Sequence, residues 1–242
     1  MPYILEKCVA GKTIEYRKYY AIKAHPRESG GISKEKADPE KVAKDRQRRA
    51  EINLRRLMNA NFKDGDYLVT MDYFRNIPKD SKEMQKGMQS FIRRIKYKFD
   101  KEKKLLKYIY VKEVGPKGSR HIHLMLNQCP IEWIRESWKA GGIHINPLYS
   151  QGQYAQIASY FIKYSKKTEE TEGKLIGKRW YGSRTLIKPR ITKRIIKANR
   201  YSEKIKHKKG FFLDKSSVES GVNIFGYSFF AYTLIQIPKE GG

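Results

Sequence analysis

The sequence predicts an α+β fold in which antiparallel strands alternate with amphipathic helices. Segments rich in β-branched and aromatic residues recur along the chain and are joined by short turns, a pattern typical of hairpins. Between them lie segments whose apolar residues repeat at helical spacing, so each helix has one face that can pack on a sheet. With 242 residues, the chain is long enough for one large domain, or for one domain with appendages.

The N-terminal part is predicted to form a hairpin followed by a helix. The hairpin strands cover 3–9 and 12–20, with Gly11 in the turn. The polar stretch 25–38 is predicted to be a mobile connection, and its last residue caps a helix over 39–59. The arginines of this helix fit either phosphate contacts or a solvated charged face.

The middle of the chain predicts the strands and helices of a sheet domain. Its strands are expected over 67–74, 107–114, 120–126 and 143–148. Asp80 or Ser81 caps a helix between the first two strands, and a short helix begins at Pro130. In the first of these helices the apolar residues share one face, while lysines and arginines cover the other.

The C-terminal part combines a helix, a basic segment and further strands. The helix is predicted over 153–167, and the acidic run after Thr168 is predicted to be an exposed loop. The basic segment 177–194 suits phosphate contacts and base stacking, although its pair Trp180 and Tyr181 fits a core equally well. Short strands are expected over 210–238.

The charge of the chain points to a polyanionic partner. Lys and Arg number 52 against 25 Asp and Glu, a formal net charge of +27, for which nucleic acid is the leading partner and a membrane surface an alternative. Two cysteines far apart argue against a disulfide framework and a cysteine-rich zinc site. No apolar run approaches the roughly 18 residues of a membrane span and the N-terminus lacks signal-peptide order, so we expect a soluble, cytoplasmic protein without membrane contact.

A pair of histidines in the strand 120–126 is the first candidate site. Alternate side chains of a strand share a face, so His121 and His123 point to one side and the apolar residues between and after them to the other. If this strand and the preceding one form a hairpin around the turn 115–119, Glu113 lies opposite His121. Two imidazoles and a carboxylate suit a divalent cation with open coordination positions, although a lone strand pair is more often structural.

The predicted helix over 153–167 carries the second candidate site. On a helical wheel with about 100° per residue, the face turned away from the apolar residues is formed by Tyr160, Lys163, Tyr164 and Lys167. The apolar arc includes Tyr154, which is therefore assigned to the core. Such tyrosines are by default surface aromatics of an amphipathic helix, but their separation from the apolar arc favours a chemical role.

Together the two sites suggest strand cleavage in nucleic acid. A phenol, with a pKa of about 10, becomes a useful nucleophile when a nearby cation favours its ionised form, and the lysines lie one turn away. A cation held by Glu113, His121 and His123 can polarise a phosphodiester, so that a tyrosine attacks phosphorus and forms a 5′-phosphotyrosyl link. Because the bond energy is retained, the attached strand can pass to a 3′-hydroxyl or to the second tyrosine.

In order and spacing, three motifs resemble those of the HUH endonuclease superfamily, in its rolling-circle replication initiator (Rep) branch. They are the strand YLVTMDYF at 67–74, His121-Ile122-His123, and Tyr160-x-x-Lys163-Tyr164-x-x-Lys167. The paired tyrosines are similar to those of initiators from small single-stranded-DNA phages and related plasmids. The segment GSRTLIKP and the C-terminal tail are more loosely similar to Rep-like proteins of Gram-positive bacteria and their phages.

The resemblance implies a central five-stranded antiparallel sheet of the RRM or ferredoxin-like type with helices packed on it, and Mg²⁺ or Mn²⁺ as the metal. The implied metal ligands are His121, His123 and Glu113, and the implied nucleophiles are Tyr160 and Tyr164 with Lys163 beside them. The expected DNA contacts are Lys167, Arg120, Lys178, Arg179 and Arg184. Members differ in the third ligand and in the number of tyrosines. A single nucleophile here would be Tyr160, because single-tyrosine members keep a lysine three residues later.

The predicted organisation has three parts: an N-terminal hairpin, connection and helix over 1–60, the nuclease core over 61–170, and a basic segment with strands over 171–242 that completes the same domain. The expected partners are single-stranded or supercoiled origin DNA, with a helicase and polymerase from the host or element, since no Gly-x-x-x-x-Gly-Lys-Ser/Thr phosphate loop occurs. Two alternatives stay open: a non-catalytic nucleic-acid-binding module, and a transposase or relaxase of the same superfamily. His144, flanked by isoleucines, is interpreted as a strand histidine without a chemical role.

Overall fold

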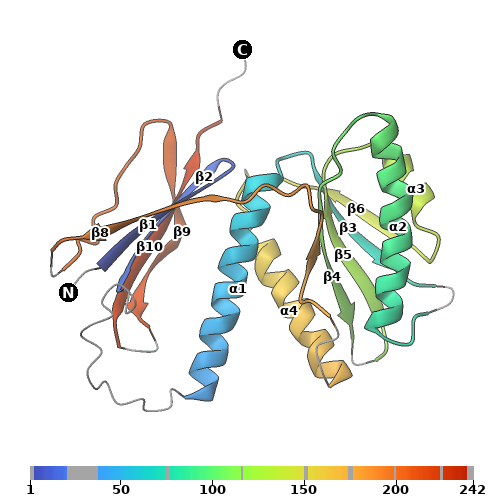
Figure 1. The fold of residues 1–242 in the computed structure, drawn as a ribbon, viewed down its shortest axis with the longest axis horizontal. Helices are drawn as coiled ribbons and strands as arrows, with labels where there is room; N and C mark the ends of the chain where they lie inside the picture. Colours follow the sequence, from blue (N-terminus) through green and yellow to red (C-terminus); the bar gives the residue numbers. More distant parts are fainter. Residues whose placement is uncertain are drawn as a thin grey trace. The chain divides into compact units, whose positions relative to one another are not determined.

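The chain forms two sheets, each in a compact unit of its own. A computed structural model describes residues 3–20, 38–74, 77–115, 117–149, 152–173, 177–198, 200–223 and 226–238. The contacts divide the chain into Met1–Ala60 with Lys188–Gly242, and Asn61–Ile187. Each unit has a five-stranded antiparallel sheet (Figure 1), so the predicted α+β class is confirmed. The predicted mobile connection lies, except for Asp38, outside the described residues.

The first unit is built on the sheet β8-β1-β2-β10-β9. Its strands are β1 Tyr3–Ala10, β2 Thr13–Tyr20, β8 Arg190–Ile196, β9 Phe211–Val222 and β10 Ser228–Gln236. As predicted, β1 and β2 form a hairpin; its turn residue Gly11 has a φ of +54°, and a side chain there would collide with the carbonyl of Asn59. β8 was not predicted, because its four β-branched residues lie among arginines and a lysine, and most of the strand was interpreted as part of the basic segment. Its pairing with β1 joins distant parts of the chain.

The helix α1, Pro39–Asn61, is attached to this sheet by buried ion pairs. It begins as predicted at Asp38, whose carboxylate accepts a backbone hydrogen bond at 2.9 Å. Arg56 donates to Glu15 at 2.9 Å and to Glu6 at 2.7 Å, and all three side chains are buried. Arg56 therefore holds the helix on the sheet, which is neither of the two roles predicted for the arginines of this segment.

The second unit is built on the sheet β6-β3-β5-β4-β7, the five-stranded sheet expected for the middle of the chain. Its strands are β3 Tyr67–Asp72, β4 Tyr108–Val114, β5 Arg120–Leu126, β6 Ile143–Pro147 and β7 Tyr181–Gly182. Its helices are α2 Ser81–Lys101, α3 Ile131–Ser137 and α4 Ala155–Glu172. α2 covers one face of the sheet and α4 the other (Figure 1).

The main core of this unit lies between α2 and the sheet. α2 starts as predicted at its N-cap Asp80, and its apolar stripe is buried: Met84, Met88, Phe91, Ile95 and Phe99. From the sheet, β3 and β5 contribute Val69, Met71, Ile122, Leu124 and Leu126. Burial of each such side chain is worth roughly 1.5–3 kcal/mol. This packing fixes which face of each strand is apolar, so the alternate residues of β3 and β5 face α4.

The acidic run after Thr168 differs from its prediction. It continues α4 to Glu172 and is not an exposed loop, and Gly173 ends the helix with a φ of +71°. Glu172 accepts hydrogen bonds from the backbone nitrogen and the hydroxyl of Ser81, both at 2.7 Å. The acidic composition indicated solvent exposure, whereas these contacts to the start of α2 stabilise the last helical turn.

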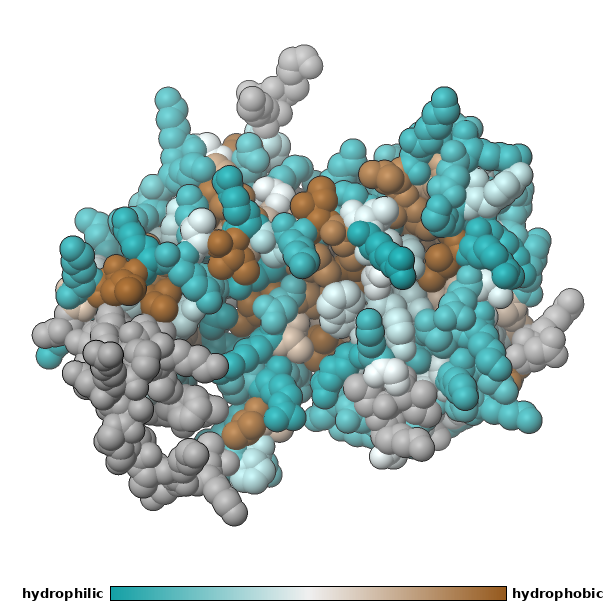
Figure 2. All heavy atoms as spheres, in the orientation of Figure 1, coloured by the Kyte–Doolittle hydropathy of each residue, from teal (hydrophilic) through white to brown (hydrophobic). Residues whose placement is uncertain are grey.

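Polar side chains cover much of the surface of the described residues (Figure 2). Hydrophilic side chains dominate the face drawn in Figure 2. Across the part of the chain that the structure describes, no helix has the length and apolar character needed to cross a membrane.

Candidate active site

The histidine strand β5 has the register that the sequence predicted. β4 and β5 form an antiparallel hairpin in which Glu113 pairs with His121 and Val114 with Arg120. The turn is closed by a backbone hydrogen bond from Gly115 to Ser119 at 2.8 Å. The apolar residues of β5 are buried toward α2, so the two histidines lie on the other face, where both are partly exposed. The hairpin therefore brings two imidazoles and one carboxylate together.

Each imidazole is bonded to a carboxylate. His123 Nε2 lies 2.8 Å from Glu113 Oε2, and His121 Nδ1 lies 2.6 Å from Asp72 Oδ1. Asp72 was not predicted as a site residue, although it pairs with His121 across the β3–β5 ladder. The available signal was alternation: Thr70 and Asp72 share the face of β3 opposite its buried apolar residues. Locating Asp72 beside a histidine required the long-range pairing of two strands.

Glu113 carries the strongest electrostatic perturbation of the site. Its side chain is 7% exposed, and Oε1 accepts a hydrogen bond from Lys167 Nζ at 2.5 Å. The hydrogen bond from His123, and that from Lys167, lower the pKa of Glu113 to about 2 even though burial works in the opposite direction. The carboxyl group of Glu113 is therefore anionic at neutral pH, and Lys167 is its cationic partner.

The donor set fits a divalent metal by its chemistry. Among the described residues, no three His, Cys, Asp or Glu side chains are arranged together as ligands, because each imidazole is bonded directly to a carboxylate. His121, His123 and Glu113 nevertheless supply two imidazole nitrogens and a carboxylate, donors that suit a divalent cation. The contact from Asp72 to Nδ1 of His121 fits the role of a carboxylate that orients a ligating imidazole.

The tyrosine helix α4 lies over this site. The ring of Tyr164 stacks on that of His123, with centroids 4.1 Å apart and planes 12° apart. The ring of Tyr160 follows at 6.3 Å from Tyr164, and Tyr160 is 54% exposed. Tyr154 is 1% exposed, which confirms its predicted place in the core. The helix thus presents its two outward tyrosines beside the histidine strand.

The two tyrosines differ in their surroundings. Burial raises the pKa of Tyr164, and the carboxylate of Glu113 and the neighbouring Tyr160 raise it further, while Lys167 opposes them. The ammonium of Lys167 is held by Glu113 and not between the phenols. Lys163 is exposed on the same helix. In this arrangement Tyr164 resists ionisation, whereas Tyr160 is open to a strand approaching from solvent.

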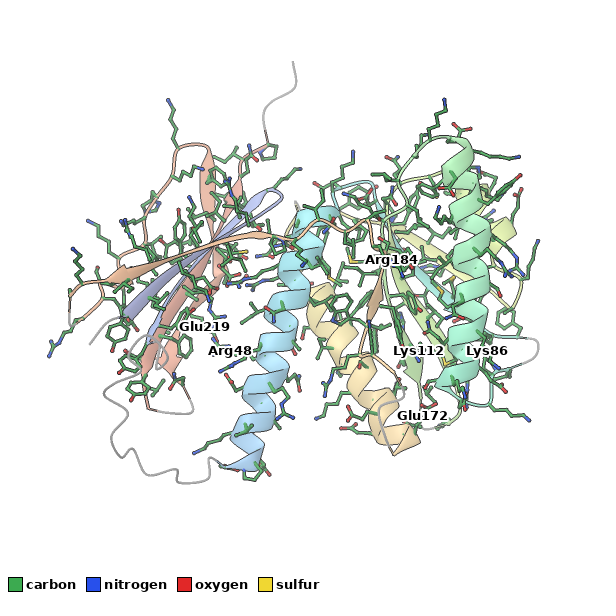
Figure 3. The ribbon with its side chains drawn as sticks, viewed as in Figure 1. Arg48, Lys86, Lys112, Glu172, Arg184 and Glu219 are labelled. Atoms are coloured by element: carbon green, nitrogen blue, oxygen red, sulfur yellow. The ribbon has the colours of Figure 1, made fainter. Side chains whose placement is uncertain are left out.

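The position of α4 along the sheet is set by its last turns. Among the described residues, β7 pairs with β4 at Ile109 and Tyr110 only, so the same edge of β4 has no partner strand near Val114. There the hydroxyl of Thr168 accepts from the backbone of Val114 at 2.9 Å and lies 2.9 Å from the carbonyl of Lys112. The ammonium of Lys112 donates to the carbonyl of Ser81 at 2.9 Å, close to the Glu172 anchor; Figure 3 labels Lys112 and Glu172.

Among the side chains predicted to contact DNA, some are bonded within the protein and others are exposed. Arg120 donates to backbone carbonyls of its own turn and of the segment before α2, at 2.8 and 2.5 Å. Arg179 pairs with a carboxylate of α4 at 3.4 Å. Lys178 and Arg184 are exposed. His144, to which no role was given, is exposed in β6 and pairs with Thr70, so it lies on the face of the two histidines.

One comparison with known proteins found a match, and it covers the region of the candidate site. Residues 66–169 match a family model described as replication-associated protein ORF2/G2P. The match runs from the start of β3 to the last turns of α4 and includes both histidines and both tyrosines. Neither the curated proteins nor the solved structures returned a match. The similarity supports a replication initiator of the Rep type, for which DNA is the partner.

Proposed function

We propose that the protein initiates rolling-circle replication of a phage or plasmid by nicking one DNA strand at the origin and later rejoining it. The observation that carries the proposal is the stack of Tyr164 on His123, which places a tyrosine of α4 within the imidazole and carboxylate cluster. The match to a replication-associated family over the same residues supports it. With this function, we expect the protein to be a soluble enzyme in the cytoplasm of the bacterial host.

The proposed reaction is a transesterification. The phenolic oxygen of Tyr160 or Tyr164 attacks phosphorus, and the bond between phosphorus and the 3′-oxygen breaks. The phenolic proton leaves, a proton is taken up by the departing 3′-oxygen, and the 5′-phosphate remains on the tyrosine. In the reverse step a 3′-hydroxyl displaces the tyrosine, so no bond energy is lost to water.

Different residues of the chain would have different roles in this reaction. A divalent cation, Mg²⁺ or Mn²⁺, would supply Lewis-acid polarisation of the phosphate, and His121, His123 and Glu113 would hold it. Asp72 keeps the imidazole of His121 in one orientation through its contact with Nδ1. Lys167 occupies Glu113 in the resting arrangement, and its release from that carboxylate would leave an ammonium one helical turn from Tyr164.

The two tyrosines suit consecutive transfers. Tyr160 is the more exposed, and Tyr164 carries a raised pKa, so Tyr160 is the better first nucleophile. A strand attached to Tyr160 leaves Tyr164, whose ring is 6.3 Å away, for a second transfer. If only one tyrosine acts, Tyr160 is the one we propose, with Lys163 exposed on the same helix three residues later.

Trapping the covalent adduct tests the proposal. Purified protein with Mn²⁺ and single-stranded or supercoiled origin DNA should yield a nick and a protein-linked 5′ end. The adduct should fall in Tyr160→Phe and disappear in the double variant with Tyr164→Phe, whereas Tyr149→Phe, an exposed tyrosine of the same unit, should retain it. An undiminished adduct in the double variant would contradict the assignment.

One observation favours a second candidate, a DNA-binding module without chemistry. In the described part of the chain both imidazoles are bonded to carboxylates and no ready group of three metal ligands exists. Binding that needs no metal, survives His121→Ala and His123→Ala, and is accompanied by no nicking would support this candidate against the enzyme.

A further inference from the structure

A second candidate site lies in the unit Asn61–Ile187, on the face of the sheet opposite the histidines. An open pocket of about 510 Å³ is formed between α2 and the strands β4 and β7. Its walls from the sheet are Tyr108, Tyr110 and Tyr181, whose side chains lie on the α2 side, while His121 and His123 lie on the α4 side. Its volume falls within the roughly 300–1,000 Å³ of small-molecule sites.

The pocket is lined by aromatic faces. Tyr110 and Tyr181 stack with centroids 5.1 Å apart and planes 11° apart, and Tyr108 lies 6.0 Å from Tyr110. From α2, Tyr97 reaches the same pocket and is 61% exposed. A solvent-exposed tyrosine on a helix gains nothing for the core, whereas a flat ring beside other rings can stack on a nucleobase.

The pocket also carries positive charge for phosphate. Its α2 wall includes Arg93 and Lys96; Lys96 is paired with Asp100 at 2.5 Å, which leaves Arg93 as the net charge of that wall. Arg184, labelled in Figure 3, is exposed; burial raises the pKa of the Tyr108 phenol, and the charge of Arg184 opposes that rise. α2 as a whole has seven lysines and arginines against two acids, so its field favours a polyanion.

The pocket contains a buried amide oxygen as well. Gln85 lines it, and among the described residues the Oε1 atom of Gln85 is buried without a hydrogen-bond partner. Such an acceptor costs stability unless a ligand or a water molecule donates to it. Amino groups and ring N–H groups on the edges of nucleobases are donors of this kind.

We propose that this pocket binds an unpaired base of single-stranded DNA, with the base against the exposed ring of Tyr97 and a flanking phosphate on Arg93. The site prefers single strands because a base within a duplex cannot expose its face for stacking. This proposal rests on the proposed function only in taking the bound strand to be the origin strand that is nicked. The pocket would hold that strand on the face of the sheet opposite the tyrosines of α4. Binding itself requires neither metal nor nicking.

Affinity measurements on the full chain test this proposal. Fluorescence anisotropy with a labelled DNA strand of about 20 nucleotides should give a Kd that rises about tenfold in Tyr97→Ala and returns close to the wild-type value in Tyr97→Phe. Arg93→Gln should reduce the slope of log Kd against log salt by about 0.7, the loss expected for one phosphate contact on a single strand. Tyr149→Ala and Arg135→Gln, exposed residues of the same unit outside the pocket, should leave both quantities unchanged.

Photocrosslinking supplies the direct readout. A strand carrying 5-iodo-deoxyuridine should crosslink to peptides that contain Tyr97, Tyr108 or Tyr181. Unchanged affinity in both pocket variants, or crosslinks confined to α4, would overturn the proposal, as would equal losses for a duplex or an RNA strand. If the pocket variants lose affinity while no tyrosine adduct forms under any condition, the proposed nicking fails and the pocket stands.

Discussion

Glu113 serves two partners with one carboxylate, pairing one oxygen with His123 and accepting from Lys167 with the other. The ammonium of Lys167 therefore lies against the carboxylate that we propose as a metal ligand. The face and register of the two histidines were predictable from alternation and turn length, and both are confirmed. The contact between Asp72 and His121 was not predictable, since it depends on β3 pairing with β5. The ion pair between Lys167 and Glu113 was not predictable either, because the helical wheel placed Lys167 beside the tyrosines.

Lys167→Met should strengthen metal binding, because it removes the cation that competes for Glu113. We expect the Mn²⁺ dissociation constant to fall roughly five- to tenfold, a modest effect because the lysine is partly solvated. Mn²⁺ electron paramagnetic resonance titration measures this without reference to activity. Lys166→Met, an exposed lysine of the same helix, is the control. Equal affinity in wild type and Lys167→Met would mean that Lys167 only anchors the helix.

At the scale of the element, α4 is held in place by contacts that could not be predicted from the sequence of the helix. Helical periodicity correctly separated Tyr154 from the outward tyrosines. The last turn was predicted as a loop because three acidic residues in a short run favour solvent. The structure instead uses Thr168 to satisfy the unpaired end of β4 and Glu172 to hold the start of α2. Both contacts join residues far apart in the chain, so composition alone could not indicate them.

Thr168→Val should loosen α4 on the sheet. The substitution keeps the shape but leaves the backbone N–H of Val114 without its acceptor, at a cost of roughly 1–3 kcal/mol in the free energy of unfolding. Urea unfolding followed by tryptophan fluorescence reports on this unit, because Trp133, Trp138 and Trp180 all lie in it. Adduct formation should fall as well, because Tyr164 loses its fixed position over His123.

Thr171→Val is the matched control for that prediction. The hydroxyl of Thr171 is exposed and donates only within its own helix, to the carbonyl of Lys167 at 2.9 Å. Its replacement should change stability by no more than about 0.5 kcal/mol. Equal effects of the two substitutions would remove the role given to Thr168.

At the scale of the whole molecule, the chain divides into two units that each carry a sheet. The hairpin β1–β2, the helix α1 and the strands near the C-terminus were expected as additions to a central sheet. Their assembly into a second five-stranded sheet depends on β1 pairing with β8 and β2 with β10, contacts between the two ends of the chain. Local patterns predicted most of the strands of this sheet and the pairing of β1 with β2, but not the pairings with β8 and β10.

The first unit should lose stability in acid. Burial alone would raise the pKa values of Glu6 and Glu15, but Arg56 acts on both and Arg55 on Glu15, and both pKa values are lowered. A carboxyl group whose pKa is lower in the folded state than in the unfolded state stabilises the fold. This contribution is complete above the ordinary carboxyl pKa of 4.5, and it is lost as the pH falls through the pKa of the folded state.

Hydrogen exchange, corrected for intrinsic rates, measures this in peptides from β1 and β2. The opening free energy should fall by about 1–3 kcal/mol between roughly pH 5.5 and 3. The same measurement on Arg56→Met should give lower protection with a weaker pH dependence. Protection in wild type that is constant over this range would contradict the assigned role of the ion pairs.

The most direct test of the central claim is to map the covalent adduct by mass spectrometry after reaction with origin DNA and Mn²⁺. Trypsin cleaves after Lys163, so Tyr160 and Tyr164 fall on different peptides and can be told apart. The proposed mechanism predicts a nucleotide linked through its 5′-phosphate to Tyr160, with a second population on Tyr164, and no adduct in His121→Ala. A nick without any protein-linked end, or an adduct on a residue outside α4, would contradict it.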